Sequence, residues 1–160
     1  MVPFITTLTE KKLLGLRQTM SFANNTTAQL WQGFMPRRKE IAQVVGTDMY
    51  SLQNYPEGFF NDFNPDVEFE KWAAVEVSGC SAIPEGMEVL ELAGGLYAVF
   101  VYKGSPVAAA GFYRAIFEDW LPKSGYALDV RTHFEVLGAK YKNGAEDSEE
   151  EVWIPIKPLS

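Results

Sequence analysis

The sequence holds a single cysteine, Cys80, and a single histidine, His133, in 160 residues. A disulfide needs two cysteines and structural zinc sites use four Cys or His ligands, so one chain can build neither. Cys80 has no assignable base partner, and no serine stands in a GxSxG turn, which disfavours the usual nucleophilic catalysis. GxGxxG and P-loop strings are also missing. We therefore expect no metal and no cofactor.

Long apolar runs and an excess of basic charge are lacking as well. No stretch approaches the roughly 20 apolar residues that cross a bilayer, and the N-terminus has no basic segment followed by an apolar core. The 14 Lys and Arg face 21 Asp and Glu, giving a formal charge of −7, so a nucleic acid would meet net repulsion. We expect a cytoplasmic protein that has no membrane segment and does not bind DNA directly.

Hydrophobic residues, 47% of the chain, suffice for one domain with a core. In the first half, alternation predicts a strand over 4–22 and strands over 49–56 and 69–77. Between the first two, the spacing predicts a helix over 24–45, which Pro36 should kink or break because proline removes a backbone donor.

The second half repeats this order of elements. A strand pair over 87–104, broken at Gly94-Gly95, precedes a helix over 105–126, and strands over 127–141 and 149–158 follow. The order itself predicts an α+β fold in which each half lays one long helix on an antiparallel sheet.

A short match between the halves also indicates a duplication. An acidic residue stands two places before Trp72 in "EKWAAVEV" and two places before Trp153 in "EVWIPIKP". A duplicated βαββ unit explains both the match and the order of elements. We expect one domain over 1–160, with pseudo-repeats over about 4–80 and 87–158.

Parity predicts which side chains share a face of the sheet, because strand side chains alternate between faces. In the last strand, the even-numbered apolar residues from Val152 to Ile156 should meet the helix, which turns Trp153 to the opposite face. The valines that follow Trp72 do the same for that tryptophan. Both tryptophans are therefore expected on the face away from the helices.

The stretch "THFEVLGAKY" over 132–141 places a carboxylate mid-strand among aromatic and aliphatic residues. By the same parity Phe134 and Val136 meet the helix and Glu135 does not, so Glu135 is expected beside the two tryptophans. Aromatic rings around a carboxylate suit a flat, lipophilic cation, since ring faces attract cations by roughly 0.5 to 2 kcal/mol. The alternative is a solvated Glu135 on a face that the tryptophans merely cap.

Four stretches within about residues 87–158 carry a recognisable pattern: "LYAVFVYKG", a helix ending in "WLPKSGY", "HFEVLG" and "SEEEVWIPIKP". Together they resemble the gyrase-inhibitor-like (GyrI-like) small-molecule-binding domain, the effector-binding module of several bacterial multidrug-responsive transcription activators. "LLGLRQTMSF" and "LWQGFMPRRKEI" fit the looser N-terminal pattern. The resemblance implies the duplicated βαββ fold with a ligand cleft between the halves. Since the two repeats fill the chain, we expect a stand-alone form without a DNA-binding segment.

The resemblance also implies a site. Members commonly place a Glu in the strand that corresponds to "HFEVLG", where it faces bound lipophilic cations, and Glu135 falls on that position. The aromatic positions vary among relatives and are carried over as wall residues. The expected ligand-binding residues are Glu135, Trp72, Trp153, Tyr50, His133 and Leu137.

Two functions from different classes remain open. The protein either senses or sequesters lipophilic, cationic or planar aromatic compounds, or it hydrolyses cyclopropane-containing DNA-alkylating natural products, as stand-alone relatives do. In the hydrolase, Glu135 would act as general base or acid and Tyr50 would assist. A contact with DNA gyrase, inherited from the family name, ranks last. Exposed aromatic area would allow a homodimer, which nothing in the sequence fixes.

Overall fold

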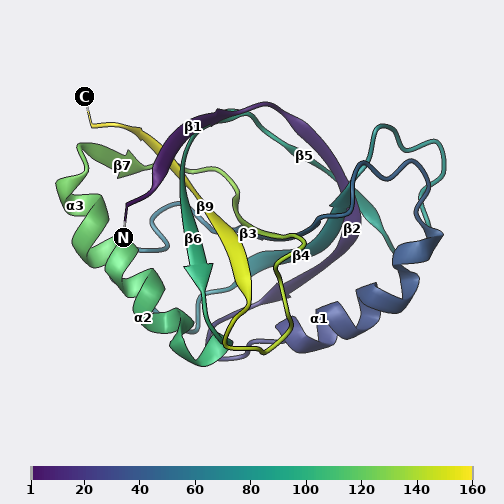
Figure 1. Cartoon of the computed structure of the whole chain (residues 1–160), viewed down its shortest axis with the longest axis horizontal. Coiled ribbons are helices and arrows are strands. Elements are labelled where there is room, and N and C mark those ends of the chain that lie inside the picture. The colour runs from purple at the N-terminus through teal and green to yellow at the C-terminus, as the bar shows by residue number, and fades with distance from the viewer. Residues whose placement is uncertain (1, 160) are drawn as a thin grey trace.

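The computed structural model describes residues 2–159 as a curled antiparallel sheet with helices on one side (Figure 1), which confirms the α+β class. The strands follow the order β1-β6-β9-β8-β3-β4-β2-β5, and β7 pairs with β9 outside this row. Their bounds are β1 (Phe4–Leu8), β2 (Lys11–Met20), β3 (Met49–Asn54), β4 (Phe69–Glu76), β5 (Glu88–Leu92), β6 (Gly95–Lys103), β7 (Tyr126–Leu128), β8 (His133–Leu137) and β9 (Glu149–Pro158).

The helices lie where the spacing predicts them. Helix α1 (Thr27–Phe34) ends just before Pro36, and a 3-10 turn (Met35–Glu40) continues the chain, so the predicted break is confirmed. The second helical segment, residues 106–123, starts with a 3-10 turn and continues as α2 (Ala109–Arg114), a π-helical stretch (Ala115–Trp120) and α3 (Leu121–Lys123).

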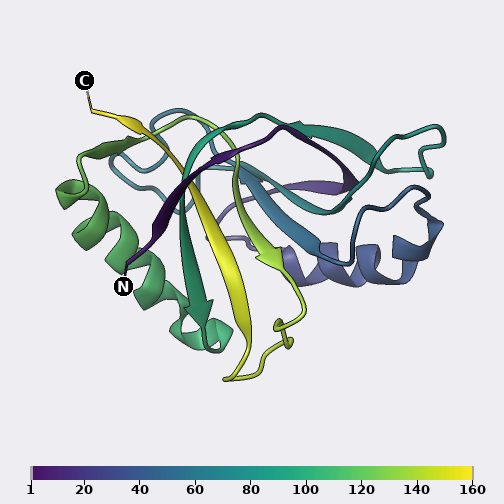
Figure 2. The same cartoon turned by 45° about the horizontal axis from the view of Figure 1, so that its top comes forward.

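Both helical segments cover the same face of the sheet, at its two ends (Figures 1 and 2). Helix α1 packs Leu30 and Phe34 against β2 and β4, and the second segment packs Ile116 against β6 and β9. We call this side the helix face and the opposite side the inner face. The central strands β3 and β8, which pair with each other, lie between the two apolar clusters.

Two short connections show why the sheet curls. Only two residues separate β1 from β2, and two separate β5 from β6, although each pair belongs to opposite ends of the sheet. Three Cα steps span at most about 11 Å, so the ends must approach each other. The connections touch where they pass: a Cβ added at Gly94 would lie 2.7 Å from the Leu8 carbonyl oxygen. The predicted bend at Gly94-Gly95 is thus a close approach of two backbones.

The curled sheet encloses its own core on the inner face. Seven of the strands contribute buried side chains to this cluster, so the inner face of the central strands is covered by protein. The buried members are Leu8, Leu13, Tyr50, Leu52, Trp72, Ala74, Leu92, Tyr97, Val99 and Phe134.

Candidate functional site

Polar side chains gather on the helix face between the two helical segments. Gln53 of β3 pairs with Lys71 of β4 on one side and with His133 of β8 on the other, and all three are buried. Ser51 pairs with Glu135 one step further along. Because neither helix covers β3 and β8 here, the sheet carries polar groups where it would otherwise carry an apolar core.

A cavity of about 210 Å³ opens above this polar row. Aromatic rings from the chain between β3 and β4 and from the second helical segment form its walls. Phe60 and Phe117 stack across it, with ring centroids 4.9 Å apart and planes 18° from parallel. The lining residues are Phe22, Gln53, Tyr55, Phe60, Lys71, Tyr113, Phe117, His133, Glu135 and Ile154.

Glu135 is the carboxylate that lines the cavity, and its side chain is 12% exposed. Its Oε1 accepts a hydrogen bond from Gln53 Nε2 at 3.0 Å, and Lys71 Nζ lies 4.0 Å from the same oxygen. Burial raises the pKa of Glu135, while Lys71 and the Gln53 hydrogen bond oppose that shift. Burial likewise lowers the pKa of Lys71, against the attraction of Glu135.

A second carboxylate, Glu150, lies on the neighbouring strand β9. Glu150 of β9 shares the face of Val152, which pairs with Glu135. Burial, and then the charge of Glu135, raise the pKa of Glu150 to about 7. Two carboxyl groups and one ammonium thus share a poorly solvated region.

His133 contributes a neutral ring to the cavity wall. Burial, reinforced by Arg131, lowers its pKa to about 3. The ring lies edge-on to Tyr55, with centroids 4.9 Å apart. At neutral pH this side chain is unprotonated, which disfavours a role as proton donor.

The expectation that Glu135 shares a face with Trp72 and Trp153 is wrong. Phe134 pairs with Trp153, and their rings stack on the inner face at 5.1 Å, whereas Glu135 pairs with Val152 and lies on the helix face. The assignment of the tryptophans and valines to their faces is confirmed; the error is confined to β8. There both faces are buried, so a hydrophobic residue does not identify the helix side.

The indole N–H groups of both tryptophans already donate hydrogen bonds within the protein. Trp72 Nε1 donates to Glu70 Oε1 at 2.5 Å, and Trp153 Nε1 donates to Glu151 Oε1 at 3.1 Å. Side chains two positions apart on a strand share a face, which explains the acid two places before each tryptophan. This repeated pair therefore has a structural role on the inner face.

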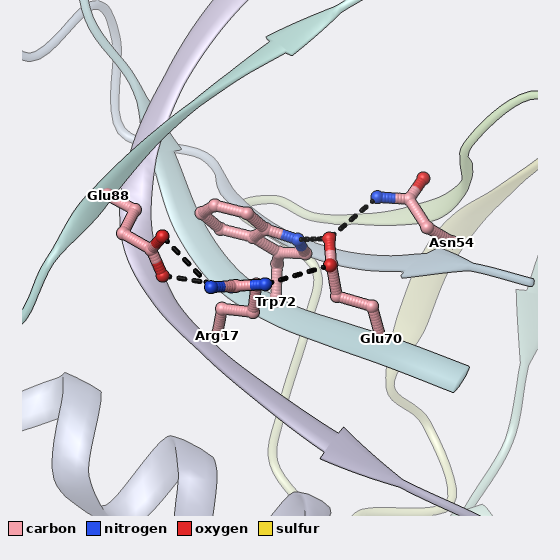
Figure 3. Close-up of polar contacts among 5 residues, drawn as sticks. All are labelled: Arg17, Asn54, Glu70, Trp72 and Glu88. Carbon is pink, nitrogen blue, oxygen red and sulfur yellow. Dashed lines mark hydrogen bonds and ion pairs between the residues drawn. The ribbon is translucent and has the colours of Figure 1, made fainter. Parts of the chain in front are cut away.

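Figure 3 shows how the Trp72 pair is extended. Glu70 also accepts a hydrogen bond from Asn54 at 3.0 Å and from Arg17 Nη1 at 3.2 Å. The Arg17 guanidinium in turn makes two hydrogen bonds to Glu88, of 2.9 and 3.0 Å. This network joins β2, β3, β4 and β5 on the side of the sheet away from the cavity.

Tyr50 and Leu137 lie outside the cavity lining. Tyr50 pairs with Val136 and packs in the inner core, where burial and nearby carboxylates raise its pKa to about 12. It is therefore on the opposite face from Glu135. Leu137 shares the face of Glu135 but lies at the end of β8, where it is buried.

Sequence reasoning missed Lys71, Gln53 and the aromatic chain after β3. One signal for Lys71 was available: it takes the same strand parity as Ala73 and Val75, the set expected to meet the helix. A lysine in an otherwise apolar row marks a place where the helix does not cover the strand. The positions of Tyr55 and Phe60 could not be predicted in this way, since side chains in a loop do not alternate between two faces.

Two more hollows lie outside this cavity. One of about 610 Å³ lies beside the 3-10 turn, between Met35 and Val75, and is wide open. Another of about 390 Å³ lies at the end of β8, where Glu149, Glu150 and Glu151 meet Lys140. Within residues 2–159, no group of three or more His, Cys, Asp or Glu side chains is arranged to hold a metal ion.

The family model of the GyrI-like small molecule binding domain matches residues 1–157. The chain belongs to the GyrI-like family. Among curated proteins, the transcriptional regulator BrlR of Pseudomonas aeruginosa is 28% identical over 146 residues, which cover 90% of this chain and 51% of BrlR. This GyrI-like domain thus spans about half the length of that relative. In its described part, no helix is long and apolar enough to cross a membrane.

Solved structures share the fold of this GyrI-like domain. The structure of SAV2435 bound to tetraphenylphosphonium has a TM-score of 0.70 at 21% identity, covering 99% of this chain and 96% of that one. A hydrolase encoded by lin2189 from Listeria innocua has a TM-score of 0.59 at 11% identity, covering 98% and 92%. At these identities the likeness concerns the fold alone.

Proposed function

We propose that this GyrI-like domain binds a lipophilic, cationic or planar aromatic small molecule in the cavity above β3 and β8, with Glu135 as the charge partner. One observation carries the proposal: a carboxylate that is 12% exposed lines a cavity walled by aromatic rings. Its Oε2 accepts no hydrogen bond from residues 2–159 and keeps accessible surface towards the cavity. A cation placed there would gain both the carboxylate and the ring faces.

The neighbour SAV2435 supports the chemistry of the ligand. It binds tetraphenylphosphonium, a lipophilic cation without hydrogen-bond donors, and it shares this fold. Such an ion needs aromatic surface and negative charge, and Tyr55, Phe60, Tyr113 and Phe117 supply the surface here. Sites for drug-sized ligands measure roughly 300 to 1,000 Å³. The cavity, at about 210 Å³, must therefore widen, and separation of Phe60 from Phe117 is the simplest way to widen it.

We further propose that the cavity lies between two repeats of one domain, residues 4–80 and 87–158. The strand order supports a pseudo-twofold arrangement: β2-β4-β3 on one side of the centre corresponds to β6-β9-β8 on the other. Strands β3 and β8 pair at the centre, and each repeat lays its helix on the same face. A ligand above the centre would contact both repeats.

A hydrolase is the second candidate, with Glu135 as general base or acid. Burial raises the pKa of Glu135 towards a useful range, and a structural neighbour is described as a hydrolase. Tyr50 lies on the other face, so Tyr55 and Tyr113 are the tyrosines placed to assist. Product analysis during the binding experiment separates the two functions: a binder returns its ligand intact.

Calorimetric titration with tetraphenylphosphonium tests the proposal. Glu135→Gln should weaken binding about 10- to 100-fold, because a buried charge partner contributes roughly 1.5 to 3 kcal/mol. Glu151→Gln is the matched control, since it removes a carboxylate of the neighbouring strand that faces away from the cavity. Equal affinity of the native protein and Glu135→Gln would contradict the role of Glu135.

A further inference from the structure

Lys71 carries an ammonium group whose hydrogen bonds are unfilled. The residue is 9% exposed, yet its Nζ donates no hydrogen bond within the described part of the chain, and its nearest carboxylate oxygen lies 4.0 Å away. An ammonium offers three donors, and Nζ keeps accessible surface, since it is not among the buried polar atoms without a partner. Because Lys71 lines the cavity, these donors are available to a molecule bound there.

Glu135 does not satisfy Lys71. The 4.0 Å between Lys71 Nζ and Glu135 Oε1 is longer than a hydrogen bond, and that oxygen is held by Gln53 Nε2 at 3.0 Å. Packing does not call for a lysine either, because Ala73 and Val75 follow it on the same face in an apolar cluster. An aliphatic residue would continue that row at lower electrostatic cost. A lysine that makes no hydrogen bond among the described residues, and whose Nζ keeps accessible surface at the edge of a cavity, therefore points to a ligand.

We infer that Lys71 is a ligand-binding residue that sets the specificity of the cavity: its ammonium donates to a carboxylate or carbonyl oxygen of the bound molecule. The inference rests on the proposed function and deepens it, because the ligand then carries two features. Its cationic or aromatic body lies against Glu135 and the rings, and its acceptor meets Lys71. Amphoteric lipophiles become the preferred class of ligand.

The charges around the cavity agree with such a ligand. The ion pair of Lys71 and Glu135 places one basic and one acidic group at the cavity. His133 adds no charge at neutral pH. A simple cation would meet repulsion from Lys71, and a simple anion would meet repulsion from Glu135. A molecule that bears both signs is complementary to both groups.

Two related probes test this on the native protein. Butyltriphenylphosphonium and (3-carboxypropyl)triphenylphosphonium share the lipophilic cation, and the second adds a carboxylate at the end of a short chain. Calorimetric titration near neutral pH should show about tenfold tighter binding of the carboxylate probe, as expected for one charge-assisted hydrogen bond to Lys71. This comparison needs no variant.

The variant Lys71→Met tests whether the preference for the carboxylate probe depends on Lys71. The variant should lose the preference for the carboxylate probe and bind the butyl probe at least as tightly as the native protein. Lys123→Met is the matched control, because Lys123 is exposed at the end of the second helical segment.

Each outcome bears on the inference. Equal affinities of the two probes for the native protein, or a preference that persists in Lys71→Met, would overturn the role of Lys71 and leave the proposed function intact. Failure of both probes to bind the native protein would overturn the proposed function and this inference with it.

Discussion

Strand β8 separates two regions of different chemistry. On the inner face, Phe134 stacks on Trp153 inside a core drawn from seven strands. On the helix face, His133 and Glu135 line a cavity together with Lys71. The tryptophans, which were expected to line the ligand site, pack in the core of the curled sheet, while Glu135 lines a cavity on the other face. A buried face is thus recognised by what covers it, and not by how apolar its residues are.

The largest expected loss of stability follows from a substitution in the core of the inner face. Phe134→Ala should lower the free energy of unfolding by about 3 to 5 kcal/mol, because a fully buried ring is lost and leaves a void. Urea denaturation measures this change. Binding of tetraphenylphosphonium per folded molecule should be preserved, since the ring faces away from the cavity. A loss below about 1 kcal/mol would mean that the inner face is loosely packed.

The helix face should respond to pH through His133. Its pKa is about 3 when folded and about 6.5 when unfolded, so between these values the unfolded chain binds more protons. The free energy of unfolding therefore falls as the pH falls, by up to about 1.4 kcal/mol per pH unit.

Denaturation at a series of pH values in native protein and His133→Gln isolates this contribution. The free energy of unfolding should fall more on acidification in the native protein than in the variant. Above the unfolded pKa of histidine, its slope against pH should be the same in both proteins. Parallel pH profiles of the two proteins would show that His133 is not buried in its neutral form.

A smaller effect on stability is expected at the cavity mouth. Phe60 is half-buried and stacks on Phe117, so Phe60→Ala should cost only about 1 kcal/mol, the range of one exposed aromatic pair. The cavity should become wider, and tetraphenylphosphonium should associate faster in stopped-flow measurements. Phe63→Ala is the control, because Phe63 belongs to the same chain segment and does not line the cavity. Equal association rates in both variants would place the entrance elsewhere.

The smallest effect concerns the acid beside each tryptophan. Glu151→Gln should change the free energy of unfolding by less than about 1 kcal/mol, since the amide oxygen still accepts the indole N–H of Trp153. Glu70→Gln should cost more than Glu151→Gln, because Glu70 also accepts from Asn54 and Arg17. Chemical denaturation of both variants compares the two pairs, and the reverse order would mean that the network of Figure 3 adds no stability.

The sequence predicted both helices, the break at Pro36 and the faces of Trp72 and Trp153, because these depend on local chemistry and on strands with one apolar face. The single strands expected over 4–22 and 127–141 are each two strands, β1 with β2 and β7 with β8, since pairing with distant strands divides them. The face of Glu135 could not be predicted in the same way. Its strand faces the cavity between the helical segments on one side and the core of the curled sheet on the other, and that curl arises from contacts between distant strands. The role of Glu135 as a ligand-binding residue stays a prediction.

The proximity of Lys71 and Phe60 to Glu135 could not be predicted from the sequence either. Each lies near Glu135 only because β4 pairs with β3, and because the chain after β3 folds back onto the second helical segment. No spacing in the sequence joins residues this far apart. Their neighbourhood is a property of the tertiary fold.

The crossing at Gly94 has a consequence for assembly. Strand β1 precedes β2 in the chain but pairs with β6, and β5 precedes β6 but pairs with β2. A backbone cut between 80 and 87 would therefore give two fragments, each of which lacks the edge strand that the other supplies. Neither fragment should be stable alone, and the mixture should reconstitute as an interlocked heterodimer.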